Sequence, residues 1–122
     1  MEKKGWKAKI KKACLEAGTY QPYYEPVIDT LAETMGIRDK CLGQYYDPRI
    51  GKGQPVVNHT NKGGATNVVK NPLLVMVNDL DTKALAYWRD LGLTPAGLKK
   101  LNAEVVKDKQ EGSFEKLLEK LL

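Results

Sequence analysis

The stretch NPLLVMVNDLDTKALAYWRDLGLTPAGLKKL, residues 71–101, decides the fold expected for this chain. Asn71 is a favourable N-cap, and Pro72 suits the first helical position, where its missing N–H costs nothing. Gly92 suits the left-handed position that closes a helix. Thr94-Pro95 then repeats the start signal. The stretch therefore predicts two helices joined by a tight turn.

Apolar residues elsewhere recur at the same spacings of three and four, the period of one helical face. The predicted helices cover residues 5–17, 23–46, 72–91 and 95–107. Gly36 weakens the second of them and marks either a bend or a close helix contact, so this element is one kinked helix or two shorter ones. The fold class expected is all-α with a small β-hairpin.

Residues 47–70 interrupt the helical pattern with four glycines and two prolines. Short β-prone runs flank Asn61-Lys62-Gly63-Gly64, which predicts a hairpin near residues 54–69. Its few valines cannot form a core, so we expect the hairpin to lean on helices or on another subunit.

Gly112-Ser113 predicts a break and a new N-cap before the amphipathic end FEKLLEKLL. We therefore divide the chain into a helical domain, residues 1–112, which contains the hairpin insertion, and a short C-terminal helix, residues 113–122. Nine residues are too few for a stable isolated helix, so this tail must dock on its own domain or on a partner. The candidate partner-binding residues are Phe114, Leu117, Leu118 and Leu121.

The apolar stripe of the helix over residues 72–91 is wide enough to contact more than one neighbour. Its members Leu73, Val77, Leu80 and Trp88 are candidates for oligomer contacts. For Trp88 a place in the core of its own chain is the preferred interpretation.

Positive charge is concentrated at one end of the chain. The net charge is +5, and residues 1–12 alone hold six lysines against one glutamate, so the rest is neutral. Such a block suits an arm or helix that binds nucleic acid phosphates, although a solvated tail explains it equally well. The DNA-contact candidates are Lys3, Lys4, Lys7, Lys9, Lys11 and Lys12, followed by Arg49, Lys52 and Lys62 in the acid-free hairpin segment.

The sequence offers few residues that could support catalysis. The only histidine, His59, lies in the hairpin, and no His, Cys, Asp or Glu grouping has the spacing of a metal site. The only serine, Ser113, is explained by capping, and Cys14 and Cys41 are expected to be small buried or half-buried residues. No run approaches the ~20 apolar residues of a membrane span. The sequence predicts a soluble, intracellular binding and assembly protein without cofactor or metal, not an enzyme.

The order of these signals resembles one family of bacteriophage terminase small subunits. A helix containing Trp6, a long helix ending near Tyr45-Tyr46, a Gly-rich stretch, Asn71-Pro72 and Leu91-Gly92-Leu93-Thr94-Pro95 follow one another as in that family. A serine and an arginine commonly follow the Thr-Pro there. This chain has Ala96-Gly97 and Lys99-Lys100 instead, which keeps the charge and changes the detail.

The resemblance implies a viral DNA-packaging protein that works in the host cell cytoplasm. Small terminase subunits form ring-like homo-oligomers, bind double-stranded viral DNA and regulate the large subunit, which holds the ATPase and nuclease. Two alternatives stay open on the sequence alone. The first two helices could form a helix-turn-helix transcription regulator, or the chain could be a structural adaptor that binds no DNA.

Overall fold

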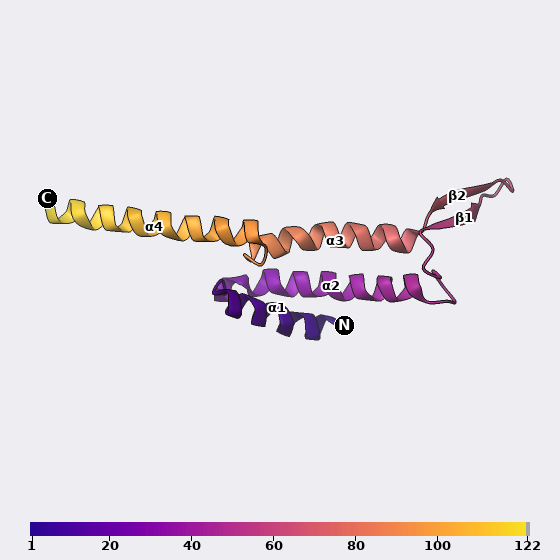
Figure 1. The fold of residues 1–122 in the computed structure, drawn as a ribbon, viewed down its shortest axis with the longest axis horizontal. Helices are drawn as coiled ribbons and strands as arrows, with labels where there is room; N and C mark the ends of the chain where they lie inside the picture. Colours follow the sequence, from indigo (N-terminus) through magenta and orange to yellow (C-terminus); the bar gives the residue numbers. More distant parts are fainter. Residues whose placement is uncertain (122) are drawn as a thin grey trace.

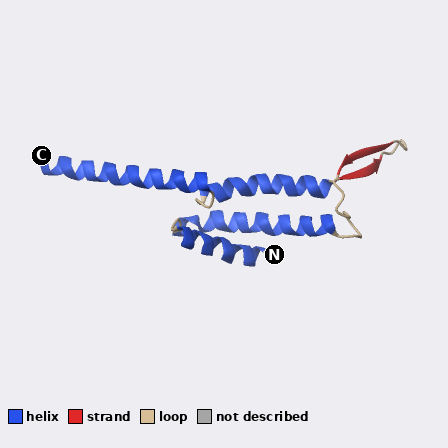
Figure 2. Cartoon of the chain, in the orientation of Figure 1, coloured by secondary structure: helices blue, strands red, loops and turns tan. Residues whose placement is uncertain are grey.

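The computed structural model describes the backbone of residues 1–121 and the side chains of residues 1–104 and 115–121. Most of the described chain is helical, with one two-stranded hairpin, as the sequence predicts (Figures 1 and 2). None of the described helices is long and apolar enough to cross a bilayer. The elements are α1 (Lys3–Ala17), the 3-10 turn η1 (Pro22–Tyr24), α2 (Glu25–Tyr46), β1 (Val56–Thr60), β2 (Thr66–Lys70), α3 (Pro72–Asp90) and α4 (Pro95–Leu121).

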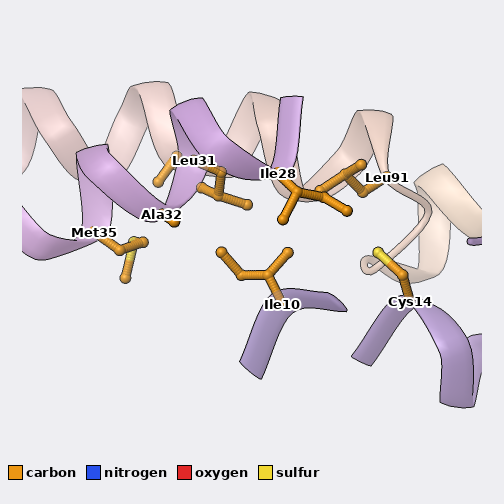
Figure 3. Close-up of a cluster of buried hydrophobic side chains, with 8 residues drawn as sticks. Ile10, Cys14, Ile28, Leu31, Ala32, Met35 and Leu91 are labelled. Atoms are coloured by element: carbon orange, nitrogen blue, oxygen red, sulfur yellow. The ribbon is translucent and has the colours of Figure 1, made fainter. Parts of the chain in front are cut away.

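Helix α2 is the centre of a small bundle. It packs along α1 on one side and along α3 on the other, and both neighbours run back along it (Figure 1). The core between the three helices consists of buried apolar side chains (Figure 3), and their burial provides the main driving force for folding. Its buried members are Ile10, Cys14, Ile28, Leu31, Ala32, Met35, Ala84 and Leu91.

The helix boundaries predicted around residues 71–95 are confirmed by their hydrogen bonds. The Leu73 amide donates to the Asn71 side-chain oxygen at 3.0 Å, which is the N-cap of α3. Gly92 has a φ of 71°, in the left-handed region, and ends the turn after α3. The Gly97 amide donates to Thr94 Oγ1 at 3.0 Å and caps α4.

Gly36 marks a close helix contact and not a break. Helix α2 is continuous from Glu25 to Tyr46. A Cβ atom at residue 36 would lie 3.1 Å from the backbone nitrogen of Lys3, so the start of α1 approaches α2 closely at this point. Of the alternatives left open by the sequence, a single helix with a tight crossing is the one observed.

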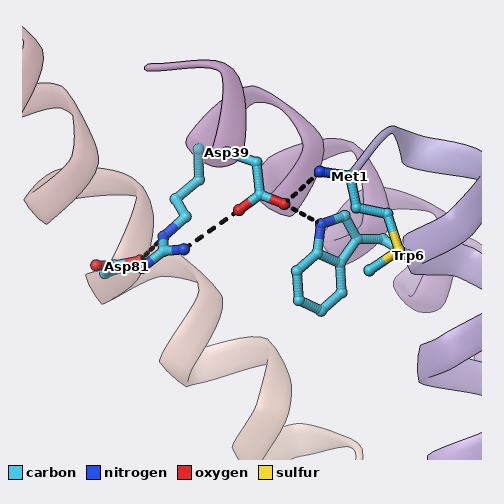
Figure 4. Close-up of polar contacts among 5 residues, drawn as sticks. Met1, Trp6, Asp39 and Asp81 are labelled. Atoms are coloured by element: carbon cyan, nitrogen blue, oxygen red, sulfur yellow. Dashed lines mark hydrogen bonds and ion pairs between the residues drawn. The ribbon is translucent and has the colours of Figure 1, made fainter. Parts of the chain in front are cut away.

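A polar network near this crossing joins all three helices of the bundle (Figure 4). Asp39 in α2 accepts hydrogen bonds from Trp6 Nε1 at 2.7 Å and from the Met1 amino group at 2.9 Å. The neighbouring Arg38 donates to Asp39 and also to Asp81 in α3, at 3.2 and 2.9 Å. The network fixes how α1 and α3 are aligned along α2.

Strands β1 and β2 form the predicted hairpin, which projects beyond one end of the bundle (Figure 2). Its antiparallel register pairs Val56 with Lys70 and Thr60 with Thr66. Every residue from 56 to 70 is exposed except Val57, which is half-buried. The hairpin therefore does not lean on its own helices, and of the two supports expected only another subunit remains as a prediction.

The break predicted at Gly112-Ser113 is wrong, because α4 runs without interruption from Pro95 to Leu121. A glycine inside a helix costs only about 1 kcal/mol relative to alanine, so helix-forming residues on both sides can compensate for this cost. The fold thus has one long fourth helix in place of a fourth helix and a separate short one. The division of the chain at residue 112 stays a prediction.

Much of the α3 stripe is used inside the chain. Val77 is 4% exposed, and Trp88 packs against the core and meets the Trp6 ring edge-on, with 6.4 Å between ring centroids. The preferred interpretation of Trp88 is therefore confirmed. Leu73 and Leu80 are half-buried. An oligomer contact through these four residues stays a prediction.

Candidate nucleic-acid interface

Helix α1 turns one row of its lysines toward acidic residues of α2. Lys3 and Lys7 both reach Asp29, with nitrogen–oxygen distances of 3.1 and 3.4 Å. One turn further, Lys11 lies 3.2 Å from Glu25. Three of the six predicted DNA-contact lysines are thus paired with acids of α2. Exposed pairs of this kind contribute about 0–1 kcal/mol each, so they mainly reduce the positive potential of this face.

The pairing also shifts the pKa values of the acids and of one lysine. A hydrogen bond from Lys3 holds the pKa of the Asp29 carboxyl below its ordinary value. For Glu25, the hydroxyl of Tyr20 donates at 2.7 Å, and this bond together with Lys11 lowers the pKa. The same contact with Glu25 raises the pKa of Lys11. Both carboxylates therefore stay charged and keep facing the lysine row.

The remaining lysines of α1 lie on its outer faces. Lys4 and Lys9 are exposed, and the Lys9 ammonium sits 4.9 Å from the centre of the Trp6 ring. Lys12 is 3.9 Å from Glu16, with both side chains mostly in water. Within α1, these three lysines are the ones best placed to reach a phosphate.

The hairpin is a defined arm because it is anchored at its base and closed at its tip. At the base, the Asn71 side chain donates to the Gln54 carbonyl at 2.9 Å, and the Asn71 amide donates to the Pro55 carbonyl at 2.8 Å. At the tip, the Asn61 side-chain oxygen accepts from the amides of Gly63 and Ala65. The cap of α3 therefore also fixes where the arm leaves the bundle.

Basic residues follow the hairpin segment from its start to its end. Arg49 and Lys52 lie in the loop before β1, and Lys62 lies at the tip, all exposed. Arg49 contacts Asp47 at 3.3 Å but remains 88% exposed. Residues 48–70 contain no acidic residue, so no negative side chain within this segment weakens its positive electrostatic potential.

Lys70, the last residue of β2, is also exposed and belongs to the acid-free segment, although it is not among the contact candidates named above. The pairing of strands places it on the face that also carries Asn58 and Thr60, since partners and alternate residues share a face. The sequence already includes it among the four basic residues of the acid-free segment.

The two groups of candidate residues are separate in space. The hairpin lies beyond the end of α2 and α3, whereas α1 lies along the side of the bundle (Figure 1). The candidate partner-binding leucines 117, 118 and 121 are at the opposite end, on the last turns of α4. The Phe114 side chain lies outside the described residues. A long ligand or several copies of the chain are needed to engage both basic groups.

Other chemistry is sparse in the part of the chain that the structure describes. No group of three His, Cys, Asp or Glu residues there could hold a metal ion. Cys14 is fully buried and Cys41 half-buried, as expected, and burial raises the pKa of the Cys14 thiol.

Comparison with known proteins identifies the family of the chain. The family model described as phage terminase, small subunit, matches residues 3–108. The chain belongs to this family. No curated protein and no solved structure matched the chain. The match runs from the start of α1 into α4 and ends before the last turns of α4. It therefore covers the bundle and the hairpin but not the end of α4. It gives the chain a role in phage DNA packaging.

Proposed function

We propose that this chain is the DNA-binding, regulatory subunit of a phage terminase. It binds double-stranded viral DNA, assembles as a ring-like homo-oligomer in the host cytoplasm, and regulates the ATPase and nuclease of a separate large subunit. It is itself non-catalytic. The family match supports the packaging role.

The observation that supports DNA binding most directly is the anchored, acid-free arm. Phosphate contacts need accessible cations on a scaffold that holds them in register along the duplex. Arg49, Lys52 and Lys62 meet this requirement, because they are exposed and belong to a segment tied to the N-cap of α3. The outer lysines of α1 form a second contact, and the lysines paired with Asp29 and Glu25 contribute less.

The helix-turn-helix alternative is less favoured by the packing. A recognition helix must enter the major groove with one face free. The candidate, α2, lies between α1 and α3 and buries Ile28, Leu31 and Met35. The adaptor alternative predicts no DNA binding at physiological salt, so the experiment that follows decides between it and our proposal.

The test is a salt titration of binding to double-stranded DNA, followed by fluorescence anisotropy. The arm variant Arg49→Gln/Lys52→Gln/Lys62→Gln should bind more weakly. The slope of log Kobs against log salt should also become shallower, by about one for each phosphate that the variant no longer neutralises. The outer-lysine variant Lys4→Gln/Lys9→Gln/Lys12→Gln should show a smaller decrease in affinity.

The matched control is Lys83→Gln/Lys99→Gln/Lys100→Gln, which removes the same charge from exposed positions on α3 and α4. It should change binding less than the arm variant does. Equal decreases in the arm variant and the control would assign the binding to net charge alone and contradict the arm. Native mass spectrometry and large-subunit ATPase assays test the ring and the regulation.

A further inference from the structure

Helix α4 carries two apolar stripes that point in nearly opposite directions. Leu98 and Leu101, near its start, are half-buried. Leu118 and Leu121, near its end, each follow one of these leucines by twenty residues, which is about five and a half turns at 3.6 residues per turn. A half turn separates the two directions. The distal stripe therefore cannot face the surface that the proximal stripe faces.

The distal stripe has no cover among the described residues. Leu117, Leu118 and Leu121 are 55%, 44% and 75% exposed, and α4 extends past the end of the bundle (Figure 1). The family match ends at residue 108, so it assigns no role to these leucines. A run of adjacent exposed leucines on one face indicates a contact with another chain.

The charges beside the distal stripe indicate which chain fits. Glu115, three residues before Leu118, lies on one side of the stripe, the acidic edge, and Lys120, three residues after Leu117, lies on the other, the basic edge. Glu119 and Lys116 lie further round the helix on the same two sides. Two parallel copies of such a helix, facing each other through their leucines, bring the acidic edge of one beside the basic edge of the other. Antiparallel copies bring like charges together, which is unfavourable.

We propose that the end of α4 associates in parallel with the same segment of further copies of this chain, through Leu117, Leu118 and Leu121. The inference deepens the proposed homo-oligomer and rests on it, because a stripe this short associates only when copies are already gathered. Assembly through the bundle then raises the effective concentration of the tails, as a tether does.

Disulfide crosslinking of the full-length oligomer tests the contact. Cys41 is replaced by serine and the buried Cys14 is kept. Leu117→Cys and Leu121→Cys, made separately, should each give linked dimers after mild oxidation. The matched control Lys116→Cys, outside the stripe, should not. Absence of links at both leucine positions, or links only when the two variants are mixed, as an antiparallel pair requires, would overturn the proposal.

Charge reversal tests the orientation in the Leu121→Cys background. Glu115→Lys/Glu119→Lys makes both edges basic and should abolish the link. Adding Lys116→Glu/Lys120→Glu exchanges the two edges and should restore it. A link that persists in the all-basic variant would contradict the pairing of edges.

The large subunit is the rival occupant of the stripe. Cysteines at residues 117 and 121 that stay unlinked, and are shielded from maleimide only when the large subunit is added, would assign the stripe to that partner and reject our proposal. Native mass spectrometry of the same samples separates the two levels of inference. An intact oligomer without links rejects the tail contact alone, whereas a monomer rejects the proposed assembly.

Discussion

The indole Nε1 of Trp6 in α1 donates a hydrogen bond of 2.7 Å to the Asp39 carboxylate in α2. Asp39 is also 3.2 Å from Arg38, which reaches Asp81 in α3. Asp39 and Arg38, neighbours in α2, thus link this helix to α1 and to α3 respectively (Figure 4). The same indole meets the Trp88 ring edge-on, so Trp6 contacts α2 through its N–H and α3 through its ring.

Replacing Asp39 should destabilise the bundle. Asp39→Ala leaves the half-buried Trp6 N–H without its acceptor, and an unpaired group of this kind costs about 1–3 kcal/mol. Urea unfolding followed by circular dichroism measures the free energy of unfolding. Asp79→Ala, at an exposed position of α3, is the control and should change it by less than about 0.5 kcal/mol. Equal losses of unfolding free energy in the two variants would contradict a stabilising role for the network around Asp39.

The same carboxylate should make the stability depend on pH. Partial burial raises the pKa of Asp39, but the hydrogen bonds from the Met1 amino group, Trp6 and Arg38 outweigh it and hold the pKa below its ordinary value. A lowered native pKa stabilises the fold above the unfolded pKa of about 3.9, and this stabilisation disappears as pH falls through the native value.

Thermal unfolding between pH 2 and pH 7 measures this dependence. The Tm of the wild-type protein should fall as pH drops below about 4. The Tm of Asp39→Asn, whose side chain does not titrate, should fall less steeply over the same range. Identical profiles would assign the acid sensitivity to other carboxylates, such as those of Glu25 and Asp29, whose pKa values are also lowered.

The centre of the core should tolerate little truncation. Leu31 is fully buried in α2, so Leu31→Ala should lower the free energy of unfolding by about 2–5 kcal/mol, because it exposes less apolar surface on unfolding and leaves a cavity. Ile37→Ala, on the same helix but 47% exposed, should cost much less. The urea midpoints of the two variants give the comparison. Similar decreases in both midpoints would contradict the assignment of Leu31 to the core.

Replacing Gly92 and Gly43 by alanine should change the free energy of unfolding in opposite directions. Gly92 has a φ of 71°, and a Cβ atom there would lie 2.6 Å from Leu101 Cδ1, so Gly92→Ala should destabilise by about 1–3 kcal/mol. Gly43 lies inside α2, and a Cβ atom added there would meet nothing within 4 Å, so Gly43→Ala should stabilise by about 0.5–1 kcal/mol. Effects of the same sign on the urea midpoint would contradict this assignment.

Local chemistry explains which parts of the fold the sequence could predict. The caps at Asn71 and Thr94 and the turn at Asn61–Gly64 depend on residues within four positions of one another, so their signals lie side by side in the chain. The prediction of a break at Gly112-Ser113 was wrong because it relied on a local stop signal and gave too little weight to the helix-forming residues on both sides.

The candidate DNA site was predicted by composition and refined by geometry. The sequence located the lysines of α1, but only the packing of α1 on α2 showed that Lys3, Lys7 and Lys11 face acids. Residues more than ten positions apart meet through helix packing, and no spacing rule along the chain encodes that meeting. Our proposal therefore assigns the main contact to the hairpin.

The sequence by itself determined the helices around residues 71–101, the hairpin and its turn, and the family resemblance, because each rests on short-range signals in a fixed order. Only the three-dimensional structure decided that α2 is central, that Asp39 and Arg38 link it to α1 and α3, and that α4 turns its last leucines away from the proximal ones. Those outcomes depend on long-range packing and on the accumulated rotation of a continuous helix.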